Sequence, residues 1–194
     1  MRSSLFFAIS ILGLALPMSA QVTPQASKGG LPIAVGAGFS NYDVDWEQYR
    51  INGGTAWADL NILPRGLGIE IEARDLKDSH LYSPSTNFRE FSLGGGVIYS
   101  WEHYRRFHPY GKFLVGYGSI HFNTGYGPIY DHDSSIDYAP GGGLAYRAFG
   151  KIWVRADYEC QFWPQLYPLF KPIYTSQGGT IGASYDFGSR HSSY

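Results

Sequence analysis

Apolar side chains alternate with polar or small ones, at a period of two, in segment after segment of this chain. In residues 67–74 the odd positions are apolar, and the even positions from 70 onward are charged. In residues 152–162 the even positions are apolar or aromatic, and the odd positions from 155 onward are polar. The charged residues of these two polar faces are Glu70, Glu72, Arg74, Arg155, Asp157 and Glu159. Because successive side chains of a strand point to opposite faces, this alternation predicts β-strands with one apolar and one polar face.

Six further segments alternate in the same way, with glycine and other small residues common on the second face. They are residues 33–40, 51–57, 90–101, 112–118, 136–147 and 180–187. The connections alternate between short turns (61–66, 102–108, 149–151) and mostly longer, polar or proline-rich loops (43–49, 76–87, 123–135, 163–176). Short turns at one end and long loops at the other are typical of membrane barrels. The sequence therefore predicts an all-β fold, a single eight-stranded antiparallel up-and-down transmembrane β-barrel.

We expect the charged faces to line the interior of this barrel. The interior of an eight-stranded barrel is narrow and filled by side chains, so charges of mixed sign are expected to pair there. The predicted interior ion-pair network comprises Glu70, Glu72, Arg74, Lys112, Arg147, Arg155, Asp157 and Glu159. The opposite, apolar faces would contact lipid and end in interfacial aromatic side chains. The predicted aromatic residues are Tyr42, Trp57, Tyr99, Trp101, Tyr117, Trp163 and Tyr185.

A soluble, lipocalin-like carrier with an apolar interior is the alternative to a membrane barrel. Such a carrier would place its polar faces in water, where charged residues would be more numerous. Charged residues make up 16% of this chain, whereas about 25% is usual for soluble domains. The composition therefore favours the membrane barrel.

The first twenty residues have the features of a signal peptide. Arg2 supplies positive charge, residues 5–16 are apolar, and Ala20 is a small residue at the expected cleavage site. We therefore divide the chain into a signal peptide (1–20), a flexible lead (21–30), the barrel (31–187) and a short tail (188–194). No later run of apolar residues is long enough for a transmembrane helix. The single cysteine, Cys160, excludes an intramolecular disulfide.

Several short motifs carry a resemblance to a known family. They are Val35 to Ser40, Pro109 to Phe113, Pro140 to Leu144, and the aromatic pair Tyr185 and Phe187 that closes the last strand. With this pattern the chain resembles the OmpA-like superfamily of small outer-membrane β-barrels. The resemblance implies a monomer in the outer membrane of a Gram-negative bacterium, surrounded by lipid and lipopolysaccharide and without a cofactor. It also implies that the outer-membrane assembly machinery recognises Tyr185 and Phe187.

The remaining motifs do not favour a catalyst. The net charge of −1 provides no basic excess for binding nucleic acid. Ser119 and His121 lie on the outward face of one predicted strand, and Asp131 and Asp133 follow in the next loop. An alternative function is therefore a lipid A-modifying hydrolase that uses Ser119 and His121. Residues 131–133 read Asp-His-Asp, but no residue elsewhere in the sequence is an evident third or fourth ligand, so we expect no metal site.

We expect a structural, envelope-stabilising or surface-interaction role without catalysis. A narrow pore is a further alternative, although eight strands leave no wide channel.

Overall fold

The computed structural model describes residues 33–45, 50–61, 66–77, 88–101, 103, 106–121, 132–164 and 173–188. The predicted signal peptide and lead, Asp131 and the tail from residue 189 lie outside these ranges. The strands are β1 (Ile33–Val44), β2 (Ile51–Leu60), β3 (Leu67–Lys77), β4 (Arg89–Ser100), β5 (Phe107–His121), β6 (His132–Phe149), β7 (Ile152–Trp163) and β8 (Tyr174–Asp186). Within the described ranges there is no helix long and apolar enough to cross a membrane.

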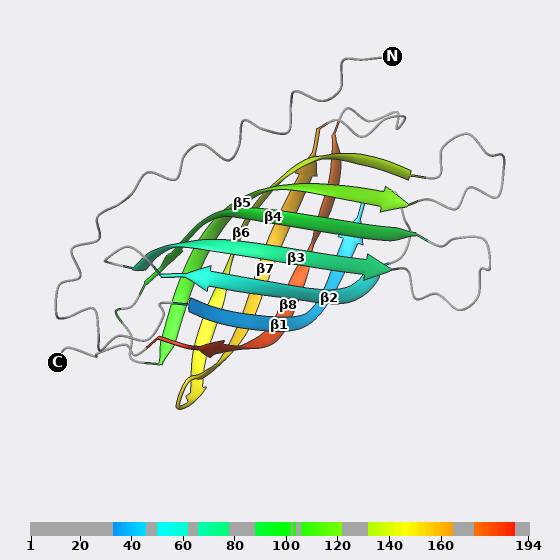
Figure 1. The fold of residues 1–194 in the computed structure, drawn as a ribbon. Helices are drawn as coiled ribbons and strands as arrows, with labels where there is room; N and C mark the ends of the chain where they lie inside the picture. Colours follow the sequence, from blue (N-terminus) through cyan, green and yellow to red (C-terminus); the bar gives the residue numbers. More distant parts are fainter. Residues whose placement is uncertain are drawn as a thin grey trace, which may run out of the picture.

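The eight strands form one closed antiparallel barrel, as predicted (Figure 1). Each strand pairs with its neighbours in the chain, and β8 closes the barrel by pairing with β1. Short connections follow β2, β4 and β6, and longer ones follow β3, β5 and β7. We call the end with the short connections the turn end and the opposite end the loop end.

Several strands extend further than the alternation of side chains indicates. β5 begins at Phe107 instead of 112, and β8 begins at Tyr174 instead of 180. In β8 the added residues are mostly polar or glycine on both faces, so they carry no period-two signal. They are strand residues because their backbones continue to pair with β7, up to Trp163 opposite Tyr174. Pairing between distant segments therefore defines strand ends that the local pattern does not mark.

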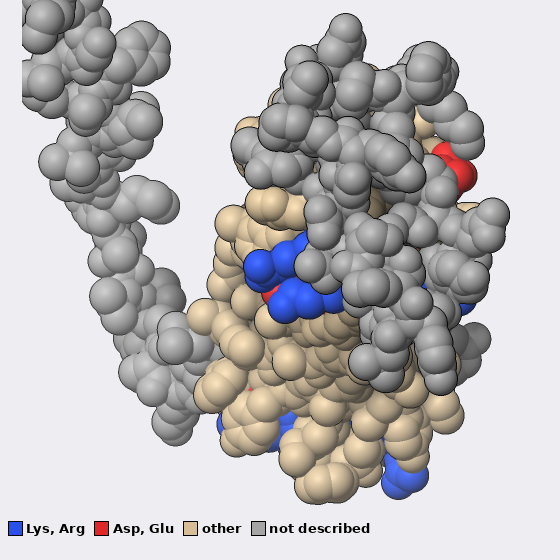
Figure 2. Space-filling model, turned by 90° about the vertical axis from the view of Figure 1, so that its right-hand side faces the viewer, with Lys and Arg blue, Asp and Glu red and all other residues tan. Residues whose placement is uncertain are grey.

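Large apolar side chains cover the outside of the barrel. Exposed examples include Val35, Phe39, Ile69, Ile71, Leu93, Val97, Phe113, Val115, Leu144 and Ile181. On the face shown in Figure 2, the described surface is mostly uncharged, and the visible Lys and Arg side chains lie near its upper part and along its lower edge. Because a soluble barrel buries its apolar face, this distribution is the reverse of a lipocalin-like carrier.

The predicted orientation of β2 is wrong. Trp57, assigned to the outer face, has only 3% of its surface exposed and points into the barrel. Its partner across the β1–β2 ladder is Gly36, and a Cβ atom at Gly36 would overlap the indole. A Cβ atom at Gly182 on β8 would lie 2.8 Å from Cη2 of the same ring. Trp57 faces inward because glycines on two neighbouring strands leave space for it.

Tyr42 and Trp163, predicted as interfacial aromatics, are also inside and fully buried. They belong to an apolar cluster inside the loop end of the barrel. The apolar cluster comprises Tyr42, Val44, Ile51, Leu76, Phe88, Ile120, Trp163 and Tyr174. Tyr99, Trp101, Tyr117 and Tyr185 do face outward. The inward aromatics follow the parity of their strands, which continues beyond the segments in which the alternation is obvious.

Candidate functional site in the interior and at the rims of the barrel

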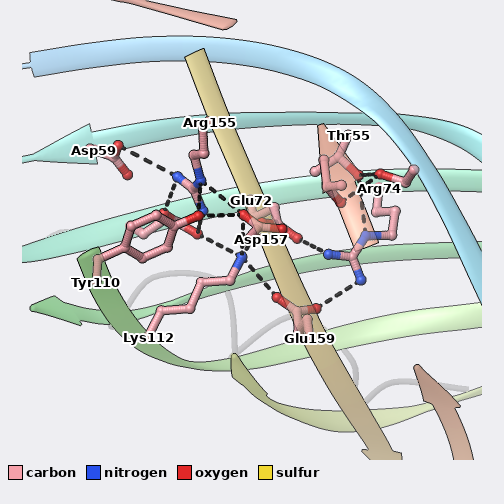
Figure 3. Close-up of polar contacts among 12 residues, drawn as sticks. Thr55, Asp59, Glu72, Arg74, Tyr110, Lys112, Arg155, Asp157 and Glu159 are labelled. Carbon is pink, nitrogen blue, oxygen red and sulfur yellow. Dashed lines mark hydrogen bonds and ion pairs between the residues drawn. The ribbon is translucent and has the colours of Figure 1, made fainter. Parts of the chain in front are cut away.

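Lys112 lies at the centre of the charged interior and is completely buried (Figure 3). Its Nζ atom is 2.6 Å from Glu72 Oε2 and 3.0 Å from Glu70 Oε1, both on β3. The same Nζ atom is 2.8 Å from Glu159 Oε2 on β7. Three strands are therefore joined by one ammonium group, in a space where an unpaired charge would cost several kcal/mol (roughly 3–5).

Arg155 forms the part of the network nearest the turn end. Its Nη1 is 2.7 Å from Glu70 Oε2, and its Nη2 is 3.1 Å from Glu70 Oε1. Its Nε donates to Asp157 Oδ2 at 2.9 Å. The guanidinium carbon is 4.7 Å from the ring centroid of Trp57 and 4.6 Å from that of Tyr110. Two carboxylates and two aromatic rings thus hold Arg155 in one position.

Arg74 extends the network toward the loop end. Its Nη1 donates to Glu159 Oε1 at 2.8 Å, and its Nη2 donates to Glu72. Its guanidinium carbon lies 4.2 Å from the centroid of the Tyr42 ring, which belongs to the apolar cluster. Arg74 therefore connects the charged layer with the apolar layer. Its Nε donates to Thr55 Oγ1 at 3.2 Å.

Seven of the eight residues predicted for the interior network contact one another in this way: Glu70, Glu72, Arg74, Lys112, Arg155, Asp157 and Glu159. Arg147 does not join them and is exposed at the turn end. Its Nε donates to the carbonyl oxygen of Gly150 at 2.9 Å. Arg147 has the inward parity that the alternation predicts, but it lies at the end of its strand, beyond the interior network. The prediction that it joins the network is therefore wrong. Arg147 lies where β6 ends, beside an irregularity in the β6–β7 register.

The interior contains further carboxylates that the sequence reasoning did not select. Glu90 and Asp137 are buried, and Asp59 Oδ2 lies 3.6 Å from Arg155 Nη1. Glu90 and Asp137 stand on the small-residue faces of their segments, so strand parity is the signal that could have found them. Asp59 was missed together with the orientation of β2. Carboxylates therefore outnumber the cations Arg74, Lys112 and Arg155 among the described interior residues.

A small polar pocket opens at the turn end of the interior. Its volume is about 60 Å³, and its lining includes Asp59, His108, Tyr110, Trp153 and Arg155. This space is large enough for a few water molecules. The charged network lies beyond it, and the apolar cluster fills the loop end. No group of three or more His, Cys, Asp or Glu side chains in the described ranges is arranged to hold a metal ion.

Ser119 and His121 face outward near the loop end of β5, as the alternation predicts. Asp133 pairs across the ladder with Ile120, which is fully buried, so Asp133 shares the inward parity of Ile120. Its Oδ1 accepts a hydrogen bond from the backbone nitrogen of Ser134 at 2.7 Å. Asp133 therefore has the opposite strand parity to Ser119 and His121. Asp131 lies outside the described residues.

A row of polar and basic side chains runs around the outside of the loop end. The register pairs Asn41 with Asn52, Asn52 with Lys77, Lys77 with Arg89, and Arg89 with His121. We call Asn41, Asn52, Lys77, Arg89 and His121 the outer row. Arg89 is held by both oxygens of Asp75, each at 2.8 Å. Arg50 donates to Asn41.

The predicted assembly pair lies at the turn end. The rings of Tyr185 and Phe187 meet edge to face with their centroids 4.8 Å apart. The backbone nitrogen of Phe187 donates to the carbonyl oxygen of Ile33 at 2.9 Å. The residue that follows β8 is therefore hydrogen-bonded to the first residue of β1, where the barrel closes.

An antiparallel barrel with an apolar outside and a charged interior is a transmembrane β-barrel. The chain belongs to the outer membrane protein beta-barrel domain family, whose model matches residues 8–187. It is a protein of the Gram-negative outer membrane, and the resemblance inferred from its sequence is confirmed. In barrels of this type the short turns are periplasmic and the long loops extracellular.

Solved outer-membrane barrels have a similar fold. Neisserial surface protein A is 17% identical, with 80% of this chain and 96% of that chain covered and a TM-score of 0.63. Ail of Yersinia pestis is 16% identical, with 82% and 97% covered and a TM-score of 0.54. Ail in complex with the heparin analogue sucrose octasulfate is 17% identical, with 82% and 97% covered and a TM-score of 0.55. No curated protein sequence matches this chain.

Proposed function

We propose that this barrel is a non-conducting, non-catalytic envelope protein that acts through its surface and binds the phosphate groups of lipopolysaccharide. The observation that carries this proposal is the outer row, in which Lys77, Arg89 and His121 face outward on adjacent strands. Below them the same strands present Leu93 and Tyr117 to lipid. The basic side chains therefore lie at the extracellular boundary of the apolar surface, the depth at which the phosphates of an outer-leaflet lipid lie.

The geometry of the outer row favours anion binding. The bidentate pair with Asp75 fixes the position of the Arg89 guanidinium, and Lys77 is its cross-strand neighbour. Asn41 and Asn52, which continue the row, bring amide groups to the same level. A barrel of similar fold, Ail, has been solved with a polysulfated saccharide analogue. A phosphorylated saccharide such as the headgroup of lipopolysaccharide has related chemistry.

A structural role without conduction follows from the layers inside the barrel. The apolar cluster fills the loop end, and the ion pairs of Lys112, Arg155 and Arg74 fill the middle. An eight-stranded barrel has no space for a channel beside side chains of this size. We expect the purified protein in planar bilayers to give no discrete current steps, and regular single-channel openings would overturn this part of the proposal.

The binding role is tested with the double variant Lys77→Gln and Arg89→Gln. Each basic residue near an anionic lipid surface contributes about 1 kcal/mol to binding. Loss of one or both contributions would lower the affinity about five- to thirty-fold, and we expect a loss in this range. Affinity is measured for lipopolysaccharide and for its dephosphorylated form. The matched control is Arg147→Gln with Lys151→Gln, which removes the same charge at the turn end. Equal affinities for wild type, double variant and control would contradict the proposal.

A further inference from the structure

The turn end has a cationic rim made of Arg106, Arg147 and Lys151, all of which are exposed. The backbone nitrogen of Arg147 donates to the carbonyl oxygen of Arg106 at 2.9 Å, so the two residues are neighbours across the β5–β6 ladder. The guanidinium of Arg147 is held by the Gly150 carbonyl oxygen. Lys151 Nζ lies 6.0 Å from the centroid of the Tyr185 ring. The three cations therefore lie along one stretch of the rim, across the β5–β6–β7–β8 side.

No exposed carboxylate accompanies these cations in the described part of the turn end. Asp186 at this end is buried and accepts a hydrogen bond from the backbone nitrogen of Gly188 at 2.8 Å. Asp59 points into the interior toward Arg155. The connecting sequences also contain Arg65, Arg105 and Glu102, which lie outside the described residues.

The two ends of the barrel therefore differ in charge. At the loop end exposed carboxylates accompany the cations: Asp75 pairs with Arg89, and Asp43 and Asp45 are exposed. At the turn end the described exposed charges are Arg106, Arg147 and Lys151, all positive. Three cations side by side repel one another, and an anionic partner would relieve this repulsion.

Aromatic side chains surround the cationic rim on the membrane side. The rings of Phe107 and Tyr146 are 4.8 Å apart, and those of Tyr185 and Phe187 are also 4.8 Å apart. Phe149, the last residue of β6 before the β6–β7 turn, is 68% exposed. Aromatic residues of this kind mark the level of the lipid headgroups. The cations beside them are therefore at the level where the phosphates of the inner leaflet are expected.

We propose that the cationic rim is a binding site for an anionic phospholipid of the inner leaflet, with its phosphodiester between Arg106, Arg147 and Lys151 and its acyl chains against the neighbouring aromatic rings. Phosphatidylglycerol and cardiolipin have this chemistry. The site is independent of the outer row, which lies at the other end of the barrel. It gives the protein a preference for one lipid class in each leaflet.

The test uses the full-length mature chain in vesicles that contain photoactivatable phosphatidylglycerol or photoactivatable phosphatidylcholine in a phosphatidylcholine background. Crosslinked peptides are identified by mass spectrometry. We expect phosphatidylglycerol to crosslink residues 106–107 and 146–151 at least fivefold more than phosphatidylcholine, because each cation near the surface contributes roughly fivefold. The triple variant Arg106→Gln, Arg147→Gln, Lys151→Gln should lose this preference.

Two further variants separate charge from folding. Arg106→Lys with Arg147→Lys retains the charge and should retain the preference, and heat-modifiable gel mobility verifies that each variant is folded. Lys77→Gln with Arg89→Gln, which tests lipopolysaccharide binding, should leave the crosslinks at the turn end unchanged. Equal crosslinking by the two lipids in the wild-type protein would overturn the proposal. So would a preference that survives in the triple variant, or binding to isolated peptidoglycan with no preference between the lipids.

Discussion

Arg155 on β7 and Glu70 on β3 form a two-pronged ion pair across the interior, with N–O distances of 2.7 and 3.1 Å. β3 and β7 occupy opposite walls, because they are four positions apart in the closed order of eight strands. Lys112 on β5 contacts the same Glu70 and also Glu159 on β7. The charged interior therefore connects walls that share no backbone hydrogen bond.

We predict that Arg155→Met destabilises the barrel by about 3–5 kcal/mol, because buried Asp157 would lose its nearest cation and Glu70 would keep only Lys112. Equilibrium unfolding by urea in lipid vesicles measures the change. In the double variant with Glu70→Gln the loss should be smaller than the sum of the two single losses. Arg147→Met is the control and should change stability little, because Arg147 is exposed at the rim. Equal losses of stability in Arg155→Met and Arg147→Met would refute the prediction that the interior ion pairs of Arg155 stabilise the barrel.

We predict that Gly118→Ala destabilises the barrel by about 1–3 kcal/mol, the usual effect of overpacking. A Cβ atom there would overlap the Trp163 ring and lie 2.6 Å from the carbonyl oxygen of Phe91. Gly111→Ala on the same strand is the control, because its Cβ atom would have the Gly141 carbonyl oxygen, 4.0 Å away, as its nearest non-adjacent neighbour among the described residues. The midpoint of urea unfolding should fall for the first variant only. A fall of the same size for both would show that loss of glycine itself matters.

We predict that replacing Ser119 and His121 with alanine leaves the acylation of lipid A unchanged. Asp133 on the neighbouring strand has inward parity, whereas Ser119 and His121 face outward, so Asp133 is not placed as the carboxylate of a catalytic triad. Mass spectrometry of lipid A from cells that express wild type or variant measures the number of acyl chains. A change in the number of acyl chains when either side chain is replaced would instead support the alternative function as a lipid A-modifying hydrolase. Weaker binding of lipopolysaccharide by His121→Ala is compatible with its place in the outer row.

We predict that Phe187→Ala slows assembly into the outer membrane without preventing folding into lipid in vitro. Phe187 is the aromatic residue at the closing seam between β8 and β1, and its exposed ring faces lipid. The fraction of heat-modifiable protein in outer membranes after a pulse of synthesis reports assembly. Phe149→Ala removes an equally outward ring at the same end, outside the terminal strand, and should assemble normally. Equal assembly of both variants would exclude Phe187 as a recognition signal.

Much of the fold was predictable because the alternation of side chains is a local property. In β3 and β7 every second residue is apolar, and the charged residues between them must turn inward once the outside faces lipid. The members of the interior network on these strands, from Glu70 to Glu159, follow from that parity alone. β2 has no such signal, because Thr55 and Trp57 alternate with Gly54 and Ala56.

The sequence by itself determined the number of strands, the apolar outside and most of the charged interior, since each depends on a period of two within one segment. The tertiary structure alone decided that Trp57 is inside, that Arg147 is at the rim, and that Lys112 joins Glu72 to Glu159. The space for Trp57 comes from Gly36 and Gly182 on other strands. The partners of Lys112 come from β3 and β7. These features depend on the register between strands and on the closure of the barrel, which place residues distant in sequence at the same height.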